Sequence, residues 1–197
     1  MEDSEDGFDD ASIPDEDSVI SEIAEGVSLS PAEHERVKDL VHGPQFQRHK
    51  GFDRRYLVVG TGESGAASQR RQLVYDQLDA RTDPPAVATQ LEDYDLTNDE
   101  IRLWVRVFDL LCGMCTHITA VIEDFDGGYV WELGLIFAPS YREKTWVLKR
   151  RYRDEQRERE QFANGMAISH VKLLLTGERA QEWTNETELR EAVRAIP

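Results

Sequence analysis

Short apolar runs alternate with longer amphipathic segments along most of this chain. Continuous apolar runs bounded by turn residues predict strands that are buried on both faces of a sheet. The predicted strands are 56–60, 86–91, 118–122, 145–148 and 171–175. Between and after them, N-capping residues and apolar residues at helical spacing predict helices over 66–80, 97–111, 129–137, 154–162 and 185–195.

This alternation indicates an α/β fold, because a helix between two strands returns the chain to begin a parallel neighbour. We expect a flavodoxin- or Rossmann-like three-layer sandwich with a parallel sheet of about five strands in the order 2-1-3-4-5. A further helix precedes the sheet. Ser30 is its predicted N-cap, Pro31 and Glu33 lie in its first turn, and it is expected to end near Gly43.

The negative charge is concentrated at the N-terminus. The formal net charge is −16, but residues 1–35 contain thirteen acids and no Lys or Arg. We therefore expect a disordered acidic tail over 1–28, a short helix and linker over 29–50, and the α/β domain over 51–197. Eighteen Arg against five Lys, together with the excess of acids, resembles the composition of salt-adapted haloarchaeal proteins.

Several classes of protein are disfavoured. No apolar run approaches the ~20 residues of a membrane span, and no signal-peptide pattern is present, so we expect a cytoplasmic protein without membrane partners. The basic run Lys149–Arg153 is followed at once by acids, which favours a solvated helix face and argues against nucleic acid.

The two cysteines cannot form a disulfide framework. Cys112 and Cys115 form a CxxC motif followed by His117, and packed thiols are the favoured interpretation. A redox pair and a metal site remain alternatives. His170 is the only downstream histidine that could complete a zinc site, so no metal residues are assigned.

A glycine-rich loop follows the first predicted strand. Gly60, Gly62 and Gly65 form G-x-G-x-x-G between a strand and a helix, the context of a phosphate- or ribose-facing loop. The acid that would complete a dinucleotide site should follow about 20 residues later. Glu92 and Asp93 follow Gly65 by 27 and 28 residues, which is late. A strand-to-helix turn without a ligand is the alternative.

An acidic segment follows the third predicted strand, where ligands of open α/β sheets bind. It contains Glu123, Asp124, Asp126 and, in the next helix, Glu132, with Gly128 permitting close approach of a ligand. The positive helix end should favour the ionised form of Glu132. The spacing singles out Asp126 and Glu132, and Glu123 and Asp124 are interpreted as bystanders. Trp104 and Trp131 are interpreted as core residues.

The segment Asp126-x-Gly128-x-x-x-Glu132-Leu133-Gly134 resembles the signature of nucleoside 2-deoxyribosyltransferases, whose superfamily includes nucleotide N-glycosidases and resembles the NAD-cleaving TIR domains. The resemblance implies that Glu132 attacks the sugar anomeric carbon and that Asp126 contacts and helps protonate the base. It also implies that Asp109 contacts the base and that Tyr56 hydrogen-bonds the nucleophile. No cofactor is implied, and sites shared between subunits imply a homo-oligomer. The family Asn that completes a neighbouring subunit's site has no identifiable counterpart here.

We therefore expect cleavage or transfer at the N-glycosidic bond of a nucleoside, nucleotide or NAD-like small molecule. The expected catalytic residues are Glu132, Asp126 and Tyr56, and the expected substrate-binding residues are Asp109, Gly60, Gly62 and Gly128. Two alternatives stay open: a nucleotide-binding sensor without turnover, and a dinucleotide-dependent oxidoreductase that uses the loop 60–65.

Overall fold

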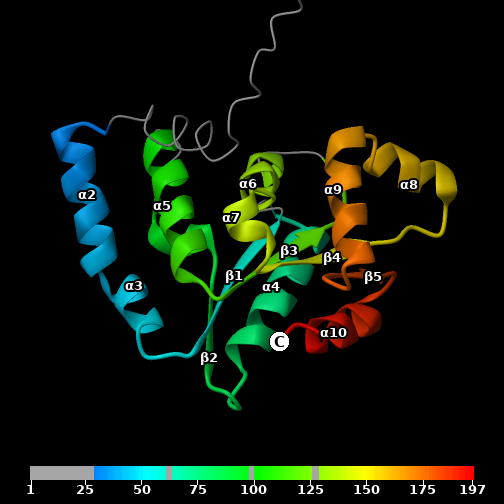
Figure 1. The fold of residues 1–197 in the computed structure, drawn as a ribbon, viewed down its shortest axis with the longest axis horizontal. Coiled ribbons are helices and arrows are strands. Elements are labelled where there is room, and N and C mark those ends of the chain that lie inside the picture. The colour runs from blue at the N-terminus through cyan, green and yellow to red at the C-terminus, as the bar shows by residue number, and fades with distance from the viewer. Residues whose placement is uncertain (1–28, 61–63, 98–99, 126–128) are drawn as a thin grey trace, which may run out of the picture.

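The central element of the protein is a parallel sheet of five strands in the order β2-β1-β3-β4-β5 (Figure 1). The computed structural model describes residues 29–60, 64–97, 100–125 and 129–197, so the expected tail over 1–28 lies outside the described residues. The strands are β1 (Arg54–Gly60), β2 (Ala86–Thr89), β3 (His117–Ile122), β4 (Thr145–Arg150) and β5 (Ala180–Trp183). All neighbouring pairs are parallel, which confirms the predicted α/β fold and strand order.

Helices cover both faces of the sheet (Figure 1). One face packs against α5 (Ile101–Met114), α6 (Tyr129–Ile136) and α9 (Gly165–Thr176), with α7 (Pro139–Arg142) after α6 and α8 (Glu155–Gln161) before α9. The other face packs against α4 (Ala66–Asp79) and α10 (Glu186–Arg194). Buried side chains alternate between the two faces along β1: Leu57 and Val59 face α5, and Tyr56 and Val58 face α4.

The predicted N-terminal helix is present as α2 (Pro31–His42). The Ser30 hydroxyl accepts from the Glu33 amide, and the Glu33 carboxylate accepts from the Ser30 amide, which completes the capping box. A second short helix, α3 (Pro44–His49), was not predicted. It buries Phe46 against Tyr94, so the segment before the sheet is anchored to the body.

The predicted fifth strand over 171–175 is wrong, because these residues lie within α9 and the fifth strand is Ala180–Trp183. Asn164 caps α9 through a hydrogen bond from the Ala167 amide. Val171 and Leu174 are buried, whereas Leu173 is 56% exposed. Buried residues three positions apart lie on one face of a helix. The continuous apolar run did not reveal this spacing, because it suits a strand equally well.

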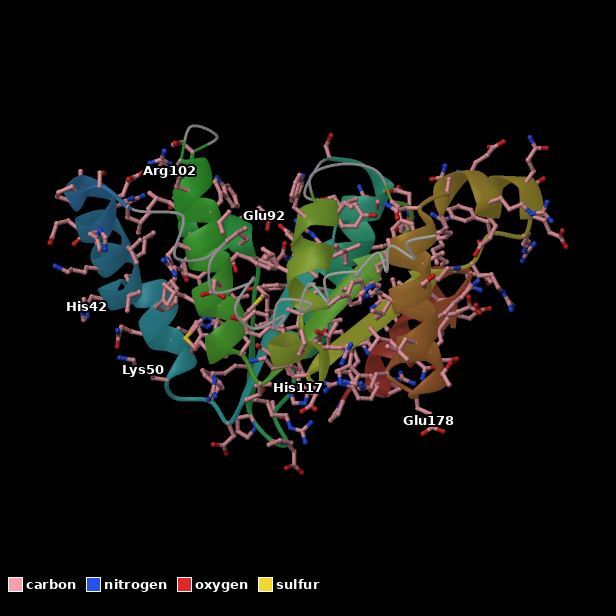
Figure 2. The ribbon with its side chains drawn as sticks, turned by 45° about the horizontal axis from the view of Figure 1, so that its top comes forward. His42, Lys50, Glu92, Arg102, His117 and Glu178 are labelled. Carbon is pink, nitrogen blue, oxygen red and sulfur yellow. The ribbon has the colours of Figure 1, made fainter. Side chains whose placement is uncertain are left out.

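The second strand is shorter than predicted and ends at Thr89. Leu91–Tyr94 forms a 3-10 turn, η1, in which the Asp93 carboxylate accepts from the Gln90 amide and the Thr89 hydroxyl. The turn leaves Glu92 exposed at the carboxyl edge of the sheet, where Figure 2 labels it. Helices α4, α5, α6, α8 and α10 match their predicted segments within a few residues at the ends, whereas the short α7 was not predicted.

Within the described part of the chain, no helix is both long enough and apolar enough to cross a membrane.

The helical assignment of 171–175 can be tested with two adjacent leucines. Leu174→Ala should lower the free energy of unfolding by about 2–4 kcal/mol, because it leaves a cavity in the core, whereas Leu173→Ala should change it by less than about 0.5 kcal/mol. Chemical denaturation of both variants measures the difference. Equal losses in the two variants would contradict the helix.

Candidate functional site

Two groups of charged side chains lie at the carboxyl edge of the sheet, beyond the ends of its strands. We call Arg71, Glu92 and Glu132 the Glu132 cluster; it lies beside the end of β1. We call Arg70, Glu123 and Arg150 the Glu123 cluster; it lies at the ends of β3 and β4. Ligands of open α/β sheets bind at this edge, so both clusters are candidates for ligand contact.

Gly60 ends β1 at a point where the backbone leaves no room for a side chain. Its φ is +147°, and a Cβ there would lie 2.7 Å from the Val121 carbonyl oxygen of β3. The Gly60 carbonyl oxygen accepts a hydrogen bond of 3.4 Å from Arg71 Nη1. Gly60 is therefore required for the close approach of β1 to β3, since any side chain there would meet the β3 backbone. Its carbonyl lies at the same edge of the sheet as the Glu132 cluster.

Arg71 connects α4 to the turn after β2. Its Nη1 donates to Glu92 Oε1 at 2.7 Å, and its side chain is only 8% exposed, whereas that of Glu92 is 42% exposed. The buried Nε of Arg71 has no hydrogen-bond partner among the described residues. A buried guanidinium favours a carboxylate beside it, so Arg71 holds Glu92 at this edge.

Glu132 lies in the first turn of α6, partly buried next to the fully buried Leu133. Burial, and to a lesser extent the charge of Glu92, raise the pKa of the Glu132 carboxyl to about 8, although the charge of Arg71 opposes the rise. The expectation that the helix end keeps Glu132 ionised is therefore wrong, because burial and the charge of Glu92 raise its pKa. At neutral pH most of this carboxyl is protonated.

Trp131 does not lie in the core as predicted, since 83% of its surface is exposed. It precedes Glu132 in α6, where successive side chains point in different directions around the helix axis. Trp104 is partly buried against the core, and its indole Nε1 donates to the Thr97 carbonyl. An exposed indole beside a partly buried carboxyl is a feature that the apolar pattern did not reveal.

The structure does not bring Tyr56 to Glu132. Tyr56 pairs with His117 at the start of β3, whereas Glu92 lies at the opposite edge of the sheet, as Figure 2 shows for His117 and Glu92. The ring faces α4 and α10, on the other side of the sheet from α6. Its hydroxyl donates to the Pro197 carbonyl at 2.6 Å and accepts from Arg81 Nη1 at 2.7 Å. In this structure Tyr56 therefore holds the last helix against the sheet.

Asp109 lies in α5, where its carboxylate accepts a hydrogen bond from the Tyr141 hydroxyl of α7. Burial raises the pKa of the Cys112 thiol above its usual range, and the charges of Asp109 and Glu132 both add to this rise. Asp109 and Glu132 therefore lie within electrostatic range of the same buried thiol. The described contacts of Asp109 link two helices and do not include Glu132.

Three of the predicted site residues, Asp126, Gly128 and Gly62, lie outside the described residues. Their assignment stays a prediction.

Glu123, which the sequence analysis interprets as a bystander to the chemistry, is the centre of an ion-pair cluster. Its side chain is 6% exposed and its two oxygens accept from Arg70 Nε and Nη2 at 2.6 and 2.5 Å, while Arg150 Nη1 donates to Oε2. Lys149, the residue before Arg150, is buried and pairs with Glu158 and Glu182. The prediction of a solvated helix face is confirmed for α8, which buries none of its residues. It is wrong for Lys149 and Arg150, which lie in β4 and form ion pairs.

Cys112 and Cys115 are free and buried, which confirms packed thiols. Burial raises the pKa of the Cys115 thiol to about 12, so neither a thiolate nucleophile nor a metal ligand is favoured there. Across the described ranges, no group of three or more His, Cys, Asp or Glu residues is placed to hold a metal ion.

Sequence reasoning missed Arg71 and the pairing of Glu123 with Arg70 and Arg150. The available signal was the Arg70-Arg71 pair early in the helix after a glycine-rich loop, together with acids that directly follow two strands. Because the carboxyl ends of parallel strands meet at one edge, such residues can pair across the sheet.

Comparison with known proteins assigns the chain to a family. A family model described as a family of unknown function, DUF8170, matches residues 9–197, so the chain belongs to this family. No curated protein matches the sequence. A crystal structure of a conserved protein from Enterococcus faecalis V583 is similar, with 14% identity, a TM-score of 0.49, and coverage of 72% of this chain and 97% of that one.

The raised pKa of Glu132 predicts a pH dependence of stability. A carboxyl whose folded pKa is about 8 and whose ordinary pKa is 4.5 binds its proton more tightly in the folded state. Its contribution to stability is therefore full below about pH 4.5 and is lost as the pH rises towards 8. Glu132→Gln should remove this loss and gain on the order of 1 kcal/mol over the wild type at pH 8.

Denaturation curves from pH 5 to about pH 8.5 measure the gain. Glu191→Gln, at an exposed position of α10, is the matched control and should follow the wild type. A constant difference between Glu132→Gln and the wild type across this range would contradict the raised pKa.

Proposed function

We propose that this protein cleaves or transfers at the N-glycosidic bond of a nucleoside, nucleotide or NAD-like molecule, with Glu132 as the group that attacks the sugar. The observation that carries the proposal is the position of Glu132. It is a partly buried carboxyl at the ligand-binding edge of the sheet, with a second carboxylate, Glu92, close enough to raise its pKa. The resemblance of Asp126–Gly134 to the deoxyribosyltransferase signature supports the same residue.

The proposed reaction requires a carboxylate opposite a developing sugar cation. The bond between the anomeric carbon and the base nitrogen breaks, its electron pair leaves with the base, and the base gains a proton. A Glu132 oxygen forms an ester with the anomeric carbon, and water or a second base then attacks this ester and releases Glu132. The resemblance assigns the proton donor to Asp126.

The raised pKa of Glu132 fits such a site. In the empty protein the proton removes an uncompensated buried charge, and the cationic sugar of the transition state would favour the ionised form. Arg71 acts here as a positioning residue, because it holds Glu92 and limits the negative charge near Glu132. Trp131, exposed next to Glu132, offers a ring face on which a planar base could stack.

One observation favours a binding protein without turnover as the second candidate. A Glu132 that is mostly protonated at neutral pH is a weak nucleophile but a good hydrogen-bond donor to a ligand. Such a sensor would bind nucleosides or nucleotides and leave them intact.

The proposal predicts that the protein releases free base from deoxynucleosides, nucleoside monophosphates or NAD. Chromatography of the reaction mixture measures this release. Glu132→Gln should lower the rate by about 10³-fold or more, because the amide cannot attack the sugar, while Glu191→Gln should match the wild type. Binding without base release, unchanged in Glu132→Gln, would favour the sensor. NAD reduced when a second substrate is added would instead indicate an oxidoreductase.

The pH dependence of kcat/KM separates the two possible roles of Glu132. A nucleophile requires the ionised form, so the wild-type rate should rise with pH to a midpoint near 8. Glu92→Gln should move this midpoint to lower pH, because it removes the charge that disfavours ionisation. A rate that falls above pH 8 would assign Glu132 as the proton donor and contradict its role as nucleophile.

A further inference from the structure

We propose that Arg70 and Arg150 form a binding site for a phosphate group, so that the preferred substrate is a nucleotide rather than a nucleoside. The binding site itself stands on the Glu123 cluster, while the consequence for the substrate rests on the proposed function.

Two arginines share one carboxylate in the Glu123 cluster. Arg70 uses Nε and Nη2 on the two oxygens of Glu123, and Arg150 uses Nη1 on the same carboxylate. The side chains of Arg70, Arg150 and Glu123 are 14%, 25% and 6% exposed. The cluster thus carries one positive charge more than Glu123 can neutralise, at a site where solvent screens charge weakly.

Two further carboxylates act on this region through their charge and offset part of the excess. Glu186 of α10 acts on Arg70, which donates its hydrogen bonds to Glu123, and Asp124 acts on Tyr152 beside Arg150. Lys149 is taken up by Glu158 and Glu182. The buried Nε of Arg150 has no hydrogen-bond partner among the residues that the structure describes. A buried donor without a partner is costly.

Aromatic rings hold both guanidinium groups in place. The Trp183 ring, at the end of β5, lies 5.7 Å from the Arg70 guanidinium carbon and 5.5 Å from that of Arg150. Arg150 also lies 4.8 Å from the Tyr152 ring. Guanidinium groups held over rings in this way lose little freedom when they bind an anion, and their fork of donors matches the geometry of a phosphate.

The position of the cluster connects it to Glu132. Arg70 and Arg71 are neighbours in α4 and belong to different clusters. Arg70 binds Glu123, whereas Arg71 binds Glu92 of the Glu132 cluster. Gly65, the N-cap of α4, provides no side-chain hydrogen bond, and the first turn of this helix contains no acid, which also favours an anion on this side. A ligand with its sugar near Glu132 can therefore extend its phosphate along the edge towards Arg70 and Arg150.

Binding of inorganic phosphate tests the site without reference to catalysis. Calorimetric titration of the full chain should show binding that Arg150→Gln weakens by about tenfold. Glu123→Gln should strengthen it, because Glu123 competes for the same donors. Arg157→Gln is the matched control: Arg157 is exposed and also lies over the Tyr152 ring, 4.9 Å away, but does not contact Glu123, so phosphate binding should be unchanged.

Circular dichroism shows whether each variant is folded, and if Arg150→Gln is not, Arg150→Lys and Glu123→Gln supply the comparison. A wild type that does not bind phosphate, or phosphate binding that is equal in the wild type, Glu123→Gln and the Arg150 variants, would overturn the site. A cluster that only stabilises the fold predicts this second result.

Base release then separates this inference from the proposed function. A higher kcat/KM for a deoxynucleoside 5′-monophosphate than for its deoxynucleoside, lost in Arg150→Gln and kept in Arg157→Gln, supports both. Equal rates for the two substrates that Arg150→Gln leaves unchanged would overturn the phosphate site and leave the proposed function standing. Phosphate binding that Arg150→Gln weakens, without any base release, would support the site and contradict the proposed function.

Discussion

Parallel pairing of β1 between β2 and β3 is the constraint on which the rest of the structure depends. It places Gly60 against Val121 so closely that no side chain fits, and it ends three strands at one edge. Both helices that carry the candidate residues are positioned by this edge: α4 follows β1 and α6 follows β3. The functional groups therefore meet because of the topology, although they lie far apart in the sequence.

Electrostatics divides this edge into two parts that behave differently. In the Glu123 cluster, two arginines pair with one buried carboxylate, so the three side chains together have a formal charge of plus one. In the Glu132 cluster, Glu92 pairs with the buried guanidinium of Arg71, and the less exposed carboxyl of Glu132 holds its proton near neutral pH. The proposed phosphate site therefore lies beside the proposed nucleophile, an arrangement that suits a phosphorylated sugar.

The sequence was sufficient to predict the parallel sheet, its strand order and the position of Glu132. These features follow from local patterns: short apolar runs, helix caps and a strand followed by acids. The error over 171–175 has a physical origin, because an unbroken apolar run suits a buried strand as well as a buried helix face. The position of Tyr56 shows the limit of motif matching, since four residues along a strand correspond to about 13 Å.

Features that depend on long-range contacts could not be predicted. The pKa of Glu132 is set by burial and by Glu92, which lies forty residues earlier in the chain. The local pattern suggested the opposite, because a helix N-terminus alone favours the ionised form. Likewise, Glu123 became an ion-pair centre only because Arg70 and Arg150 approach it from a helix and a neighbouring strand.

The central claim is that burial and the charge of Glu92 keep the Glu132 carboxyl protonated at neutral pH. Carbon-13 NMR titration of the glutamate carboxyl groups, with the Glu132 signal assigned from Glu132→Gln, measures this directly. The account predicts a midpoint near pH 8 for Glu132 and a lower midpoint in Glu92→Gln. A midpoint near the ordinary value of 4.5, unchanged in Glu92→Gln, would contradict it.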